Sequence, residues 1–288
     1  MCDKPMSKMS KFQVKKLFVY LVLSLFVIWT VGPFIWMVST SLKHYGDIFT
    51  PVPQLIPRDK ITGQVYVTLE NYHYVIEMKG LGRAFLNSLL VTIVVTAFKL
   101  FFDSLAAYAF ARIRFPGRDF FFFIVISSMM VPGVALLVPR VYITRLLGLY
   151  NSLWGLIIPM SMSVFDIFLL RQFFLNIPVE LEEASMIDGA SRWDIYWRIA
   201  LPLAKPALAL VAITSFTWHW NDLMWPLVIL TDAKKYTLPL ALALLASGQA
   251  PRPHYIMAGA TLTVIPIMII FLIFQRQILE GISITGLK

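Results

Sequence analysis

The stretch that decides the fold is EEASMIDGASRWDIYWRIALP, residues 182–202, a charged segment between two long apolar runs. Glu180, Glu182 and Glu183 fall where the positive end of a helix dipole favours carboxylates, and Asn176 is the predicted N-cap. Gly189 is suited to end that helix in a left-handed conformation. The first half of the stretch therefore predicts a short polar helix.

A second helix follows directly. Ser191 and Asp194 have the spacing of a capping box, with Asp in place of the usual Glu or Gln. One face of this helix then gathers Trp193, Tyr196, Trp197 and Ala200. The result is a helix–turn–helix insert over residues 176–205, and local physics leaves open whether it is a connector or a docking element.

The composition of the rest of the chain is that of an integral membrane protein. Of its 288 residues, 58% are hydrophobic and 14% charged, and the mean hydropathy is +0.74. Soluble domains have about 45–50% apolar and about 25% charged residues. The net charge of +9 comes mostly from Lys and Arg near the ends of apolar segments, which favours membrane anchoring over nucleic-acid binding.

Six apolar segments predict six transmembrane helices in a single all-α domain over residues 1–288. Each is long enough for a span, which takes about 20 residues. Lysines precede the first segment, and Arg112, Arg114 and Arg118 follow the second, so these ends and both termini are expected in the cytoplasm. The insert then lies on the cytoplasmic side between spans four and five. The predicted spans are 17–42, 84–111, 120–139, 152–174, 206–230 and 256–274.

Charged residues inside these segments need a reason, because charges in lipid are costly. Lys99 and Asp103 are four residues apart and can neutralise one another on one helix, or serve the transport pathway. Asp166 has three readings: a contact to a polar solute, a pair with Lys99, or a pair with a partner subunit.

Trp218, Asn221 and Asp222 form a further candidate site near the end of span five. An aromatic belt at the outer interface explains Trp218 and the neighbouring Trp220 and Trp225 well, but it explains Asn221 and Asp222 poorly. A sugar ring, with apolar faces and hydroxyl edges, also fits such a group. Both interpretations stay open on the residues alone.

Several classes of chemistry are excluded. Cys2 is the only cysteine, so no internal disulfide forms, and the four histidines have no metal-ligand spacing. The chain has no Gly-x4-Gly-Lys phosphate loop and no nucleophile–base–acid set. We therefore expect neither an enzyme nor a cofactor in this chain.

The insert resembles the EAA loop of ABC importer permeases, whose pattern is EAA-x3-G-x9-I-x-L-P. Ser185 replaces the second Ala. Further stretches resemble the carbohydrate-importer, MalG-like branch, namely NSL at 87, AAYAFARIRFPG at 106–117, FLLRQFF at 168–174, IDGAS at 187–191, WNDLMWPL at 220–227 and FQRQILEG at 274–281. Before about residue 80 the likeness is only general.

The resemblance implies a permease in the bacterial inner membrane that forms half of a translocation path. Its implied partners are a second, MalF-like permease, two ATPase subunits that bind ATP and Mg²⁺, and an extracytoplasmic solute-binding protein. The residues implied to couple with the ATPase are Glu183, Ala184, Ser185, Asp188, Gly189 and Arg192. The C-terminal GISITGLK resembles the family's tail, which also approaches the ATPase.

Two alternatives remain. An ion-coupled secondary transporter or channel would need no ATPase dock, and a membrane enzyme would need clustered catalytic groups. The sequence does not name the solute, which in such a family can be an oligosaccharide, a monosaccharide, a polyol or a glycerol phosphate.

Overall fold

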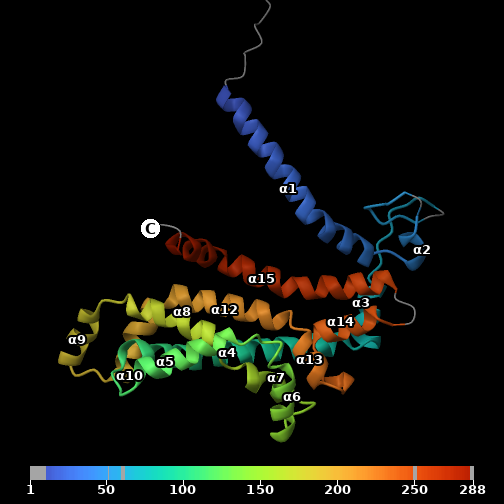
Figure 1. Cartoon of the computed structure of the whole chain (residues 1–288). Coiled ribbons are helices and arrows are strands. Elements are labelled where there is room, and N and C mark those ends of the chain that lie inside the picture. The colour runs from blue at the N-terminus through green and yellow to red at the C-terminus, as the bar shows by residue number, and fades with distance from the viewer. Residues whose placement is uncertain (1–10, 51, 60–61, 249–251, 286–288) are drawn as a thin grey trace, which may run out of the picture. The chain divides into compact units, whose positions relative to one another are not determined.

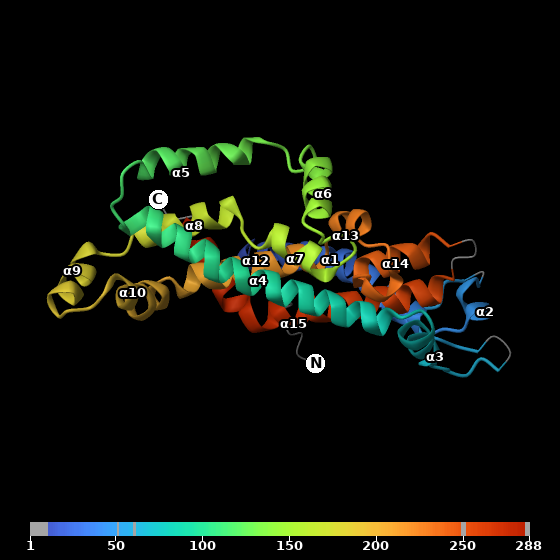
Figure 2. The ribbon, with the colours of Figure 1, turned by 90° about the horizontal axis from the view of Figure 1, so that it is seen from below.

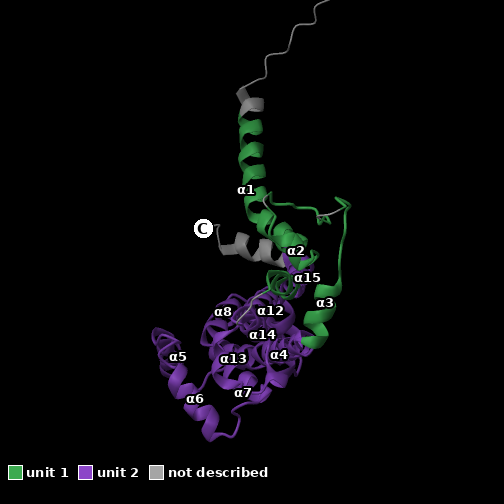
Figure 3. Cartoon of the chain, turned by 90° about the vertical axis from the view of Figure 1, so that its right-hand side faces the viewer, with its two compact units in different colours: residues 1–78, 249–261 green, residues 79–248, 262–288 purple. Residues whose placement is uncertain are grey.

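The computed structural model describes residues 11–50, 52–59, 62–248 and 252–285. Within these ranges every regular element is a helix, apart from one isolated antiparallel bridge between Arg58 and Val65. Figure 1 shows the helices coloured along the chain, and Figure 3 colours the two compact units into which the chain divides. The first comprises residues 1–78 and 249–261, and the second comprises residues 79–248 and 262–288.

The first unit contains the long apolar helix α1 (Lys11–Ser41) and three short helical segments. Residues before and within α3 close the end of α1. The side chain of Asn71 donates to the carbonyls of Ser41 and Lys43, both at 2.8 Å. These bonds satisfy carbonyls that a helix end leaves without partners. The short segments are α2 (Tyr45–Ile48), α3 (Glu70–His73) and the π-helical turn η1 (Tyr74–Met78).

The second unit is organised around α4 (Leu81–Arg112). This helix packs chiefly against α8 (Val164–Leu175) and α12 (Lys205–Trp220). Small side chains let the helices approach closely, and Ala107 and Ala207 are both fully buried in the shared core. The helix ends where Ile113 turns to an extended conformation.

The expected third span, residues 120–139, is not one helix. It consists of α5 (Arg118–Ser127) and the short turn η2 (Ser128–Met130), and α6 (Leu137–Leu146) starts only after a non-helical stretch. Pro132 lies in that stretch, where it cannot donate a helical hydrogen bond. The apolar pattern of the sequence predicts the length of this segment but not the break within it.

The expected fourth and fifth spans are also interrupted. The fourth consists of α7 (Leu153–Ile157), η3 (Ile158–Met160) and α8, with a bend of 42°. The fifth consists of α12 and α13 (Met224–Ile229), with a break at residues 221–223. The remaining elements are η5 (Ala233–Lys235), α14 (Leu238–Ala246) and α15 (Pro253–Thr285).

Three helices of the described chain are long and apolar enough to cross a membrane, or up to five when each bent pair is one span. The described part of the chain is thus all-helical, with three to five candidate membrane spans. Figure 2 shows the insert at the end of α4 from which α5 leaves. The insert consists of α9 (Val179–Ile187), α10 (Arg192–Ile195), the π-helical turn η4 (Tyr196–Ala200) and α11 (Leu201–Leu203).

Candidate functional site

The first helix of the insert, α9, does not begin at the predicted N-cap residue, Asn176. The expectation that Asn176 caps it is wrong, because the Asn176 N–H bonds to the Phe173 carbonyl and closes α8 instead. Pro178 takes the N-cap position of α9. The extended backbone of Pro178 redirects the chain between the two helices.

The C-terminal end of α9 follows the sequence expectation. Gly189 has a φ of +86°, in the left-handed region that glycine adopts without strain. Its N–H bonds to the Met186 carbonyl at 3.1 Å, and the Ala190 N–H bonds to the Ser185 carbonyl at 2.9 Å. These two bonds are those of a Schellman motif, so the turn after α9 has a defined geometry.

The predicted capping box of α10 is confirmed. The Ser191 hydroxyl accepts a hydrogen bond from the Asp194 N–H at 3.1 Å, and the Asp194 carboxylate accepts one from the Ser191 N–H at 3.2 Å. Both ends of the turn between α9 and α10 are therefore fixed by local hydrogen bonds.

The last part of α9 and the turn that follows it form the tip of the insert, which comprises Glu183, Ala184, Ser185, Ile187, Asp188 and Gly189. All of them are exposed except Ser185, which is half-buried and donates to the Leu181 carbonyl. Ile187 is 87% exposed. Within the part of the chain that the structure describes, neither Glu183 nor Asp188 has an ion-pair partner. The tip thus presents two carboxylates and a large apolar side chain that the fold does not use.

Arg192 lies apart from the tip and faces Glu182, with its Nη1 3.4 Å from the carboxylate. Arg112 at the end of α4 approaches the same carboxylate, with Nε at 3.2 Å. Sequence reasoning took Arg112 only as a topology marker and Glu182 only as a helix-dipole residue. Their opposite charges are compatible with a pair, but seventy residues separate them, so no local pattern in the sequence pairs them.

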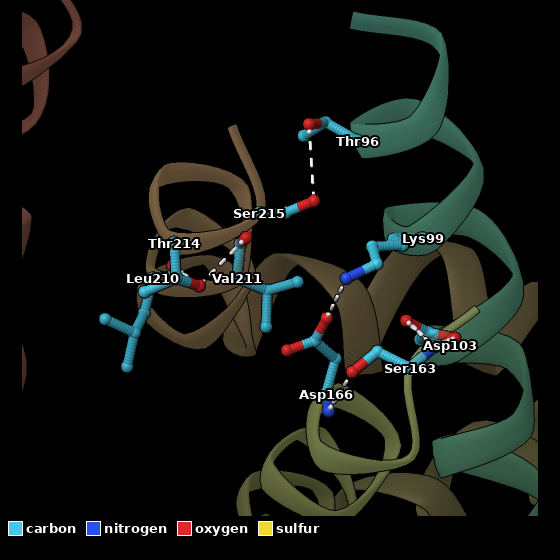
Figure 4. A network of polar contacts seen from close by, with 9 residues as sticks. All are labelled: Thr96, Lys99, Asp103, Ser163, Asp166, Leu210, Val211, Thr214 and Ser215. Atoms are coloured by element: carbon cyan, nitrogen blue, oxygen red, sulfur yellow. Dashed lines mark hydrogen bonds and ion pairs between the residues drawn. The ribbon is translucent and has the colours of Figure 1, made fainter. Parts of the chain in front are cut away.

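The buried face of α4 carries a second group of polar contacts (Figure 4). Lys99 Nζ lies 3.2 Å from Asp166 Oδ2 on α8, and Thr96 Oγ1 lies 3.3 Å from Ser215 Oγ on α12. The expected pairing of Lys99 with Asp103 inside α4 is therefore replaced by a pairing between helices. Of the three readings of Asp166, the structure therefore shows the pair with Lys99.

Asp103 has a different partner. Both of its carboxylate oxygens accept the Ser163 N–H, each at 3.1 Å. The Ser163 hydroxyl in turn accepts the Asp166 N–H at 3.3 Å. These bonds satisfy the backbone at the break before α8, where a helix start leaves N–H groups without partners. Asp103 takes this role because the fold places the break before α8 next to it. In the sequence Ser163 lies sixty residues from Asp103, so spacing alone does not indicate the contact.

Trp218, Asn221 and Asp222 line one hollow of about 650 Å³ together with Thr214, Thr217 and Met224. Asp166 does not line it. Asn221 donates to the Thr217 carbonyl at 2.8 Å, and Asp222 accepts the Trp225 N–H at 3.3 Å, so both polar groups also support the local backbone. The side chain of Trp218 has no such role, and the residue is 74% exposed.

The two other tryptophans of this region are buried. Trp220 donates its ring N–H to the Thr263 carbonyl at 2.9 Å, and Trp225 donates to the Gly155 carbonyl at 3.2 Å. They fill the core instead of contributing to an aromatic belt. Only Trp218 remains available for contact with lipid or solute.

Comparison with known proteins finds similar permease proteins. The arabinooligosaccharides transport system permease protein AraQ of Halalkalibacterium halodurans is 36% identical over 223 residues, which are 77% of this chain and 80% of that protein. The lactose transport system permease protein LacG of Rhizobium radiobacter is 31% identical over 262 residues, which are 91% of this chain and 93% of that protein.

A solved structure is similar over nearly the whole chain. The crystal structure of a bacterial ABC transporter involved in the import of the acidic polysaccharide alginate contains a chain with a TM-score of 0.81 and 25% identity, covering 94% of this chain and 99% of that one. Residues 103–283 match the family model of the binding-protein-dependent transport system inner membrane component. The chain therefore belongs to this family of ABC transporter permeases, which are membrane transport components and not enzymes, because their ATPase is a separate subunit.

Proposed function

We propose that this chain is the permease subunit of an ATP-driven, binding-protein-dependent importer for a carbohydrate, either an oligosaccharide or a related sugar or polyol. It forms half of the translocation path with a second, homologous permease. The similar proteins named for arabinooligosaccharides, lactose and alginate support a carbohydrate solute. An extracytoplasmic binding protein delivers that solute.

The tip of the insert is the observation that carries the proposal. The end of α9, held by a turn that is fixed at both ends, exposes Ile187 and two carboxylates that have no ion-pair partner among the described residues. It therefore offers a rigid surface to another protein. We assign this surface to the ATPase, which binds ATP and Mg²⁺. ATP binding closes the two ATPase subunits, the insert moves with them, and the spans alternate between inward-open and outward-open states.

The proposed topology has six spans within a single domain and both termini in the cytoplasm, which places the insert on the same side. The interrupted third, fourth and fifth segments are compatible with it, since non-helical backbone is tolerated in a membrane where it is buried in protein or lines a water-filled cavity. The hollow beside Trp218 is the proposed solute-facing surface. Asp166 serves this pathway indirectly, because its ion pair with Lys99 holds α8 against α4.

The test is a comparison between the isolated chain and the complete assembly. We would purify the chain alone and with its co-transcribed partner proteins, reconstitute both in liposomes, and measure ATP hydrolysis and sugar uptake. Solute-stimulated hydrolysis and uptake are expected only in the assembly. Uptake by the isolated chain without ATP would contradict the proposal and favour an ion-coupled secondary transporter.

A further inference from the structure

The carboxylate of Glu182 is buried where the insert meets α4. Its side chain is only 3% exposed, although it lies in the most polar segment of the chain. Arg112 and Arg192 lie within ion-pair distance of it, at 3.2 and 3.4 Å. A buried carboxylate is costly unless it is paired, so α9 cannot leave this position without separating these charges.

Arg112 contacts more than the Glu182 carboxylate. Its Nε also donates to the Phe174 carbonyl at 3.0 Å, and its Nη2 donates to the carbonyl of Ile177. One guanidinium thus connects the last turn of α4 with the end of α8, the linker after it, and α9. The planar fork of arginine suits several simultaneous acceptors, which a lysine cannot reproduce.

The second half of the insert is fixed to the same helix. The Tyr196 hydroxyl lies 2.8 Å from Ser104 Oγ, and its ring lies 5.3 Å from the ring of Tyr108. Ser104, Tyr108 and Arg112 are spaced four residues apart and so share one face of α4. The insert is covalently continuous with α8 and α12, yet its polar side chains anchor it to α4.

We propose that Arg112 and Glu182 are positioning residues that transmit the movement of the insert to α4. The inference rests on the proposed function, in which an ATPase moves the tip. Because the buried charges resist separation, a displacement of α9 carries the end of α4 with it. The contacts of Lys99 and Asp103 then pass the same displacement to α8.

The experiment uses the complete transporter in liposomes and two neutral variants, Arg112→Gln and Glu182→Gln. Three quantities are measured: ATPase copurified with the permease, the rate of ATP hydrolysis, and solute transported per ATP hydrolysed. We expect copurification to persist and transport per ATP to fall about tenfold, within the usual range of coupling between sites. Arg112→Lys keeps the charge but not the fork, and should restore part of the transport per ATP.

The matched control is Arg118→Gln, which removes the partner of Asp119, a largely exposed carboxylate that does not contact the insert. It should leave all three quantities unchanged. Should a single variant fail to fold, the double variant Arg112→Gln/Glu182→Gln removes both buried charges together and is expected to fold but to couple poorly.

Unchanged transport per ATP in the folded single or double variant would overturn the inference. So would a loss that only follows the amount of folded complex, because that result would mean a purely structural role. Failure of the proposed function has a different signature: the wild-type chain itself would not copurify with an ATPase.

Discussion

The tip of the insert and the buried face of α4 both carry charged side chains, but among the described residues only those of α4 have ion-pair or hydrogen-bond partners within the chain. Lys99 meets Asp166, and Asp103 meets the Ser163 backbone. Glu183 and Asp188 at the tip form no ion pair among the described residues. The paired charges of α4 stabilise the packing of the helices. The carboxylates of the tip are exposed on a helix end with a defined geometry, so they are available to a partner protein.

The largest expected effect concerns the ion pair on α4. Lys99→Met leaves Asp166 buried without its cation, which should lower the free energy of unfolding by about 3–5 kcal/mol. Thermal unfolding of the purified protein measures the change. The double variant Lys99→Met/Asp166→Leu removes both charges and should recover most of the loss. A double variant as unstable as the single one would mean that the pair is not what stabilises this contact.

The two neighbouring tryptophans offer the next contrast. Trp220 is fully buried and Trp218 is 74% exposed. Trp220→Ala should destabilise the protein by about 3–5 kcal/mol, because it leaves a large cavity. Trp218→Ala should change stability by less than about 0.5 kcal/mol.

Measurements of sugar uptake test whether Trp218 also has a functional role. A hollow that contacts the solute predicts reduced uptake by Trp218→Ala at unchanged stability. Normal uptake by this variant would leave Trp218 with a role at the lipid interface only.

Replacement of Gly189 tests the tip directly. Apart from its chain neighbours, no described residue has an atom within 4 Å of a Cβ placed at Gly189, so the Cβ of Gly189→Trp meets no clash. The left-handed backbone at this residue costs only about 1–2 kcal/mol. We expect membrane insertion to persist while transport per ATP falls about tenfold, a typical coupling factor.

Gly148→Trp is the matched control, because Gly148 also has a positive φ, of +70°, and open space around its Cβ. Uptake assays with both variants give the comparison. Equal transport in the two variants would contradict a docking role of the tip.

The smallest effect is expected at the cap that holds the tip. Ser191→Ala removes the hydroxyl that accepts the Asp194 N–H and should cost about 1 kcal/mol, measured by thermal unfolding. Ser191→Asn keeps a capping acceptor and should remain close to the wild type. If the two variants were equally destabilised, the cap would not be the cause.

Local features of the insert were predictable because they depend on near neighbours in the sequence. The Gly189 turn and the Ser191–Asp194 capping box involve residues within five positions of one another. Asn176 was predicted wrongly for a related reason. It is a good N-cap residue, but α8 continues far enough to engage its N–H first.

The pairing of charged residues was less predictable. Lys99 has a carboxylate four residues away on its own helix, and sequence spacing alone favoured that neighbour. The fold brings α8 beside α4, and Asp103 is engaged at the helix break before α8. Arg112 and Glu182 lie seventy residues apart, so no local pattern could join them.

The sequence by itself determined that this is an all-helical membrane protein with a capped polar insert, because hydropathy, capping and glycine turns act over a few residues. The family match confirmed the permease that the spacing from Glu183 to Pro202 indicated. Only the tertiary structure decided which charges meet, where apolar segments break, and that α4 receives the insert. Those outcomes depend on which helices pack together, and burial then forces each charge to the partner that packing supplies.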